Sequence, residues 1–459
     1  MNDRRQFIKM SAAISLAFAG RGLLADSQIS DLSKSGYGAL VKDSKGILDL
    51  PKGFSYKVVS KMGDKMTDGF LVPSRPDGMA AFQEKDLTII MRNHESNFHW
   101  DGPYGAHRKL FPKMDKSKVY DICNDGDPCT GGVSKIVYDT KKQVVISQSV
   151  ALTGTVANCA GGATPWGSWI TCEETLRKTN DVAWKKRRYS KDHGYNFEVK
   201  ANSKLEICEP IPLKAMGRFR HEAVGVDPKT GIVYQSEDRG NGLLYRFLPN
   251  EKGNLVKGGK LQALVFEKQA KFVTNNWDAK YGLMTPGVKY KTRWIDLNNV
   301  ESPGDTLRKQ GRSKGASAFC RGEGIFFGNN ELYLACTAGG AKKLGQIFKY
   351  IPAVDEAKGS KSEKGGTIEL HYESQSERDM RFCDNITVSP WGDIIACEDF
   401  GGDDVRLIGL TPKGNPYTFA SHHLKNEFTG ATFSPDGTTL FVNVQSPGLT
   451  FAISGPWKK

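Results

Sequence analysis

The chain shows a recurring pattern in which a turn built on Pro or Gly leads into a short, mostly apolar run that ends in acidic residues. The pattern is complete in three segments, residues 164–174, 227–238 and 389–399. Weaker copies occupy residues 329–337 and 434–443, and residues 86–95 form a sixth candidate. Short β-prone runs bounded by Pro and Gly are typical of strands. The pattern therefore predicts an all-β fold.

Repeated units of strands and tight turns indicate a radial or stacked β architecture. The intervals here are long and uneven, which indicates inserted loops between units. Six units favour a six-bladed β-propeller with inserted loops and short helices. We expect residues 26–459 to form this single domain, with 252–315 as a candidate cap over the channel. The last strand, 449–453, is expected to pair with N-terminal residues and close the ring.

A polar segment begins the strand that precedes each of these turns. In an antiparallel hairpin the start of the first strand lies beside the end of the second. Polar heads and acidic tails are therefore expected to meet at one mouth of a central channel. The acidic residues gathered in this way are Glu95, Glu173, Glu222, Glu237, Glu323, Glu398 and Asp399.

So many carboxylates in one place repel each other unless cations neutralise them. A single acid after a strand can equally be a solvated surface charge, but acids that recur in register favour metal binding. Cys172 precedes Glu173, and a thiolate there favours a transition metal over calcium. Cys397 holds the same register and is the rival candidate.

Two further polar residues at strand heads are candidates for holding an anion. Arg321 can bind a phosphate or carboxylate through its fork of donors. Asn158, at the head of another unit, offers a neutral donor to the same anion. The alternative for Arg321 is a salt bridge to one of the channel acids.

The net charge of +13 results from 64 basic and 51 acidic residues. No basic stripe interleaved with aromatic residues occurs, so we expect no nucleic-acid partner. A basic surface can still attract a small anionic substrate. The apolar runs after the N-terminus are too short for a stable membrane span. Among the nine cysteines, Cys123 and Cys129 form the one plausible local disulfide.

Residues 1–25 are predicted to be an export signal that takes no part in the fold. Arg4 and Arg5 match a twin-arginine motif, which is followed by the modest apolar stretch from Met10 to Ala19. An uncleaved signal anchor is the alternative. The motif predicts export by the twin-arginine machinery, which carries folded proteins, to a periplasmic or secreted location.

Taken together, these residues resemble the bacterial PhoX alkaline phosphatases over essentially the whole mature length. The matching segments are 51–54, 77–79, 93–95, 158–162, 164–167, 171–174, 218–222, 234–239, 321–324, 384–385, 397–399 and 445–448. The resemblance implies a six-bladed propeller that holds iron (Fe3+) with calcium (Ca2+). It also implies hydrolysis of phosphate monoesters at alkaline pH by a metal-bound oxide or hydroxide nucleophile.

Carried over to this chain, the resemblance assigns a role to each candidate. Cys172 is similar to the family's thiolate ligand of iron, and Asn158 and Arg321 are similar to the pair that holds the phosphoryl group. The residues similar to the family's carboxylate ligands are Glu95, Glu173, Glu222, Glu323 and Glu398, with Glu237, Asp238 and Asp399 as outer candidates.

The leading hypothesis is a monomeric, exported, metal-dependent phosphatase that acts on small-molecule phosphate esters. One alternative is a calcium-dependent propeller lactonase, which Arg321 and the thiol disfavour because a lactone carries no phosphate charge. Another alternative is a non-catalytic propeller in which cations only stabilise a binding module.

Overall fold

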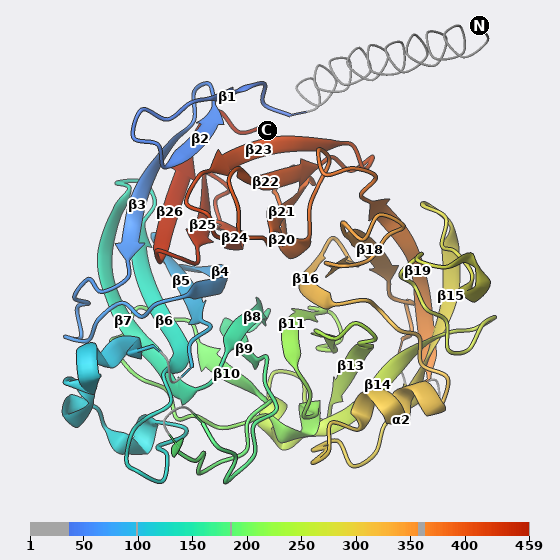
Figure 1. Ribbon diagram of the computed structural model, residues 1–459, viewed down its shortest axis with the longest axis horizontal. Coiled ribbons are helices and arrows are strands. Elements are labelled where there is room, and N and C mark those ends of the chain that lie inside the picture. Colours follow the sequence, from blue (N-terminus) through green and yellow to red (C-terminus); the bar gives the residue numbers. More distant parts are fainter. Residues whose placement is uncertain (1–35, 98–99, 184–185, 357–362, 459) are drawn as a thin grey trace, which may run out of the picture.

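The computed structural model describes residues 36–97, 100–183, 186–356 and 363–458. The predicted export signal, residues 1–25, lies outside the described residues. Most of the described chain forms antiparallel sheets arranged around a central axis (Figure 1). The predicted all-β fold is therefore confirmed. Within the described ranges the only α-helix is α2 (Leu307–Ser313), and the other helices are single 3-10 turns.

The described residues form five hydrogen-bonded sheets. The first contains β4 (Pro76–Glu84), β5 (Leu87–His94), β6 (Gly131–Asp139) and β7 (Val144–Thr155). The second contains β8 (Asn158–Ala163), β9 (Ser168–Glu173) and β10 (Asn196–Lys200). The largest runs from β11 (His221–Val226) through β12 (Val233–Glu237), β13 (Leu244–Pro249), β14 (Gly259–Phe266) and β15 (Lys289–Asp296) to β19 (Lys364–Glu373), β18 (Gln346–Ile351), β17 (Glu331–Cys336) and β16 (Gly322–Gly328).

The remaining two sheets join the ends of the chain. One contains β20 (Cys383–Val388), β21 (Ile394–Glu398), β22 (Val405–Leu410) and β23 (Pro416–His422) with β2 (Leu48–Pro51) and β1 (Leu40–Val41) at its edge. The other contains β24 (Phe428–Phe433), β25 (Thr439–Val444) and β26 (Leu449–Ser454), completed by β3 (Ser55–Lys61). Because β26 pairs antiparallel with β3, the expected closure of the ring by the C-terminal strand is confirmed.

The arrangement is propeller-like, but the sheets are not six separate blades. In the described part of the chain, four of the five sheets have the four or more strands of a blade. One sheet has only three strands, and β15 pairs with both β14 and β19, which fuses two hairpin sets into one nine-stranded sheet. The sequence pattern shows the hairpins but not which sheet edges pair.

The segment 252–315 does not form a separate cap. It contains β14 and β15, which extend the nine-stranded sheet, and α2, which lies near them at the rim of the molecule (Figure 1). Apolar side chains on these strands, among them Leu264 and Trp294, are fully buried. Their burial against neighbouring strands explains why this segment joins the sheet.

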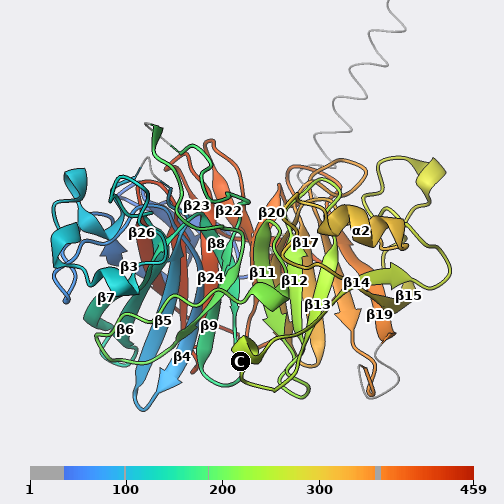
Figure 2. The same ribbon diagram turned by 90° about the horizontal axis from the view of Figure 1, so that it is seen from below.

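Six strands, β4, β8, β11, β16, β20 and β24, lie innermost, and each contacts the next around the axis. In side view, β8, β11 and β24 occupy the middle of the molecule (Figure 2). Together the six strands line a cavity of 310 Å³ that is walled mainly by small and apolar residues. The strands begin at one end of this cavity, and the polar heads gather there.

Candidate metal centre

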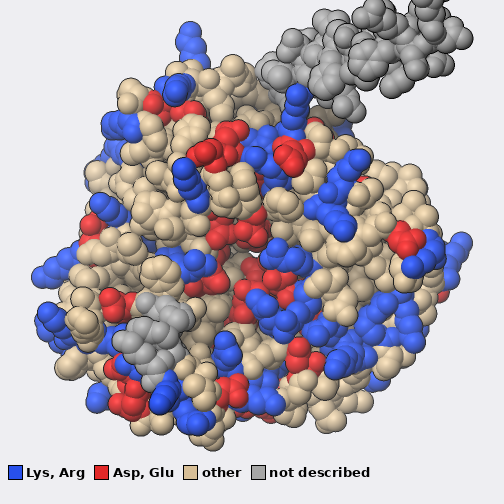
Figure 3. Space-filling view, in the orientation of Figure 1, with Lys and Arg blue, Asp and Glu red and all other residues tan. Residues whose placement is uncertain are grey.

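The candidate centre is built from one equivalent position on each innermost strand. The second residues of these strands are Asp77, Cys159, Glu222, Glu323, Asp384 and Thr429. Asp and Glu side chains fill the hollow at the middle of the molecule, with Lys and Arg around it (Figure 3). The expectation that polar heads meet at one mouth is therefore confirmed for these residues.

The second strand of each inner hairpin returns to the same end and adds another side chain. The first residues after these strands are Glu95, Glu174, Asp238, Thr337, Asp399 and Gln445. Four of the six are acidic, so the tails contribute charge beside the heads. The hairpin argument placed the tails at the correct end and included Glu95 and Asp399, but at Glu173, Glu237 and Glu398 it also chose the last residue of the strand.

The acidic and thiol side chains form three linked groups that could each hold a metal ion. The groups are Cys159 with Glu174 and Glu222, Glu222 with Glu323 and Asp384, and Asp384 with Asp399 and Glu427. Within each group the ligand atoms lie within 4.8 Å of one another. Because Glu222 and Asp384 each belong to two groups, the donors form one continuous cluster.

Burial and mutual repulsion make these carboxyl groups hard to ionise in the absence of cations. Burial raises the pKa of Glu174 to about 8, and nearby Asp238 and Glu95 act in the same direction. Burial, followed by the charges of neighbouring carboxylates, also raises the pKa well above its usual range for Glu222 and Asp384. Cations would compensate both effects, because they replace lost hydration and separate like charges.

The donor set fits a mixture of cations. A thiol among carboxylates suits a transition metal such as iron, whereas an all-oxygen group suits calcium. One oxygen of the buried Asp77, Oδ1, has no hydrogen-bond partner within the described ranges. The cost of leaving such an atom unpaired is avoided if it binds a cation or water.

Each inner hairpin carries a backbone irregularity next to the cluster. The register shifts within the first strand of all six hairpins, between Pro76 and Met79 in the first and at the matching place in the others. The residue before the strand adopts a left-handed φ of 51° at Arg75, 51° at Ala157 and 52° at Arg321. A bulge re-aims side chains, so simple alternation does not predict which residues face the axis.

Arginines bridge the acids around the centre. Arg75 pairs with Glu95, and Arg220 pairs with Glu174. Arg321 donates from Nη2 to Glu323 Oε1 at 2.6 Å and from Nε to Asp238 at 3.0 Å. Its side chain is 39% exposed, so part of the guanidinium faces solvent at the mouth. Arg321 therefore forms the salt bridges of the alternative hypothesis while still facing the site.

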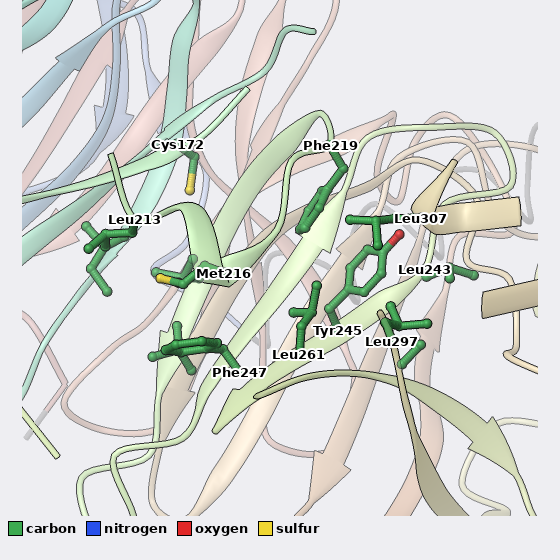
Figure 4. Close-up of a cluster of buried hydrophobic side chains, with 14 of the residues drawn as sticks. Cys172, Leu213, Met216, Phe219, Leu243, Tyr245, Phe247, Leu261, Leu297 and Leu307 are labelled. Carbon is green, nitrogen blue, oxygen red and sulfur yellow. The ribbon is translucent and has the colours of Figure 1, made fainter. Parts of the chain in front are cut away.

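Cys172 does not lie in this cluster. Its thiol is fully buried among apolar side chains that include Leu213, Met216 and Phe247 (Figure 4). Burial alone raises the pKa of this thiol, with no acid contributing. The expectation that Cys172 faces the channel is therefore wrong. The rival Cys397 is also buried in an apolar cluster.

Glu173 is held inside its blade instead of facing the axis. Its carboxylate accepts hydrogen bonds from the backbone nitrogens of Val156 at 2.9 Å and Gly194 at 2.8 Å. His193 Nδ1 lies 2.6 Å from Oε1 of the same group. With both oxygens engaged, Glu173 organises the loop that contains His193, and the expectation that it lies in the centre is wrong.

Glu398 also belongs to the structure of its blade. Arg406 Nη2 donates to Oε1 at 2.5 Å, and Arg381 Nη2 donates to Oε2 at 2.9 Å. Two arginines fully engage this buried carboxylate, so the structure does not bring Glu398 into the metal cluster. Glu237 is similarly bound by Arg308 and Tyr245.

Asn158 is likewise not free to hold an anion. Its Oδ1 accepts from Thr155 at 2.6 Å, and its Nδ2 donates to Thr171 at 2.9 Å. The residue is fully buried. The structure thus assigns Asn158 to holding the hairpin of β8 and β9.

Four of the expected carboxylates, Glu95, Glu222, Glu323 and Asp399, do lie at the centre, as does Arg321. The ligand candidates that the sequence pattern did not single out are Asp77, Cys159, Glu174, Asp384 and Glu427. Two of them, Cys159 and Glu174, are the direct neighbours of the expected residues Asn158 and Glu173. A one-residue change of phase along a strand turns a side chain to the other face. This explains why the centre contains Cys159 and Glu174 instead of Asn158 and Glu173.

Beside the cluster lies a cavity of 490 Å³. Its lining includes Glu95 and Glu174 together with Arg177, Arg220 and Arg239. A cavity of this size accommodates a small organic molecule.

Comparison with known proteins identifies the family. A family model described as Alkaline phosphatase PhoX matches residues 35–126 and 137–448. The structure of Pseudomonas fluorescens PhoX in complex with vanadate superposes with a TM-score of 0.66 at 18% identity, covering 89% of this chain and 96% of that chain. A gluconolactonase from Xanthomonas campestris is more distant, with a TM-score of 0.41, 10% identity and coverage of 92% and 98%. No curated protein matches the chain by sequence.

Proposed function

This chain belongs to the PhoX alkaline phosphatase family, and on that premise we propose that it is an exported, metal-dependent enzyme that releases phosphate from small phosphate monoesters. The observation that carries the proposal is the continuous cluster of one thiol and six carboxylates at the head of the inner strands. Such a cluster is costly to bury unless cations occupy it.

We assign the cations by the chemistry of the donors. Cys159, Glu174 and Glu222 would hold iron, because a thiolate is a soft ligand. The all-oxygen groups around Glu323, Asp384, Asp399 and Glu427 would hold calcium. When bound, such cations neutralise the phosphoryl oxygens and activate water for attack.

The chain's own contribution to catalysis is to position and neutralise the phosphoryl group. Arg321 offers a half-exposed guanidinium beside the cluster, and its fork of donors matches phosphoryl oxygens. Asp238 and Glu323 hold that guanidinium in place through Nε and Nη2. Donors fixed in advance stabilise the charge of the transition state without reorganisation.

Metal analysis and an activity assay test the proposal together. The purified protein should contain iron and calcium, and it should hydrolyse a chromogenic phosphomonoester at alkaline pH. A chelator should abolish turnover, and restoring the metals should recover it. Metal-free protein with undiminished turnover would contradict the proposal.

Two finer points accompany the proposal. We propose that residues 1–25 direct twin-arginine export to the periplasm or beyond, which replacement of Arg4 and Arg5 by Lys should block in a fractionation experiment.

We also propose that the fold corresponds to six blades, each built on one innermost strand, with β15 joining two of them. In the described part of the chain, no helix is long and apolar enough to cross a membrane.

A further inference from the structure

The 490 Å³ cavity beside the acidic cluster carries more positive charge than its pairing with the acids requires. Arg177, Arg220 and Arg239 all line it, together with Glu95 and Glu174. Arg220 pairs with Glu174, which links the cavity directly to the cluster. Arg177 and Arg239 add positive charge to the cavity wall that neither Glu95 nor Glu174 neutralises through an ion pair.

Arg177 has no ion pair through its guanidinium among the residues that the structure describes. Its backbone carbonyl accepts hydrogen bonds from Arg218 Nη2 and from the backbone nitrogen of His193, both at 2.8 Å. Its charge acts on Tyr189, which also lines the cavity: burial raises the pKa of Tyr189, and Arg177 opposes that rise. An exposed, uncommitted guanidinium therefore stands near the cavity wall.

Arg239 is only partly satisfied. Its Nη2 donates to Asp305 at 3.2 Å, and Asp305 is shared with Arg308. Its Nε is buried and has no hydrogen-bond partner in the described ranges, and the same is true of Arg220 Nε. Buried donors without acceptors are costly, so neither guanidinium is fully satisfied by the protein groups around it.

We propose that Arg177 and Arg239 form a second anion subsite, which selects phosphate monoesters whose organic part carries another negative charge, such as a carboxylate. The inference rests on the proposed function, because the reacting phosphoryl group would occupy the mouth beside Arg321. The organic part then extends into the cavity, where a guanidinium binds a carboxylate or phosphate through paired donors.

A pair of esters that differ in one terminal group tests the subsite. 3-Phosphoglycerate ends in a carboxylate, whereas glycerol 3-phosphate ends in a neutral hydroxyl group. The metal-loaded enzyme should favour the carboxylate ester in kcat/KM. Because the subsite is partly open to solvent, Arg177→Gln should lower the ratio of the two kcat/KM values by about 3- to 10-fold, and Arg177→Gln/Arg239→Gln should lower it further.

The matched control is Lys178→Gln. Lys178 is the exposed neighbour of Arg177 and does not line the cavity, so its removal changes net charge equally. The ratio should stay at the wild-type value in this variant. An equal fall in Lys178→Gln would mean that general surface charge, not a subsite, causes the preference, and would overturn the proposal.

A binding measurement separates failure of the subsite from failure of the activity. Calorimetry with 3-phosphonopropionate and propylphosphonate should show an Arg177-dependent preference for the carboxylated ligand. If this preference exists while neither ester is hydrolysed, the subsite stands and the proposed activity is wrong. If esters are hydrolysed but the ratio is unchanged in both variants, the subsite is wrong. Absence of binding by both phosphonates also overturns it.

Discussion

Two cysteines on neighbouring strands provide a sharp test of the metal centre. Cys159 Sγ lies within 4.8 Å of ligand oxygens of Glu174 and Glu222, whereas Cys172 packs among apolar side chains. Both are at most 5% exposed, so Ala at either position removes one buried sulfur and should lower stability similarly, by about 1 kcal/mol. Only Cys159→Ala removes a proposed ligand. Loss of the metal removes several kcal/mol of transition-state stabilisation. Turnover should therefore fall by on the order of 100-fold or more.

The assay measures iron content by elemental analysis, turnover of a chromogenic phosphomonoester, and the unfolding midpoint of each variant in its metal-free form, to which bound metal contributes no stability. Cys159→Ala should lose iron and activity, and Cys172→Ala should keep both at nearly wild-type levels. The similar thermal cost of the two changes excludes misfolding as the cause. If Cys172→Ala loses iron while Cys159→Ala retains it, our assignment of the thiol ligand is refuted.

Three further predictions concern charge. Glu398→Gln should lower the free energy of unfolding by about 3 kcal/mol, because Arg381 and Arg406 lose their buried partner, while iron and calcium content per folded molecule should not change. Metal-free protein should become less stable between pH 5 and 8.5, because the raised pKa of Glu174, about 8, means that the folded state holds a proton that the unfolded state has lost. If the melting temperature of the metal-free protein instead rises with pH over that interval, the titration of Glu174 is not the cause. Arg321→Gln should reduce kcat/KM for an aryl phosphate by about 10- to 1,000-fold with metal content retained, and an unchanged rate would leave Arg321 as an ion-pair partner alone.

The sequence was sufficient to predict where the site lies along the chain. Pro and Gly turns, short apolar runs and polar heads identify the hairpins, and an antiparallel hairpin brings its two open ends together. The positions of Glu222 and Glu323 in the cluster and of Arg321 beside it follow from that local geometry. The family resemblance added the activity and the expected metals, which spacing alone could not provide.

Only the tertiary structure decided which side chains face the axis. The hairpin of β8 and β9 is buried on both faces, so hydrophobicity does not distinguish the orientation of Cys159 from that of Cys172. A bulge in each inner hairpin shifts the alternation near the site, and left-handed residues such as Arg321 precede four of the six inner strands. Likewise, the pairing of β15 with β19 depends on sheet edges that meet only after the ring forms. Local periodicity specifies hairpins, but long-range packing determines the face that each strand presents.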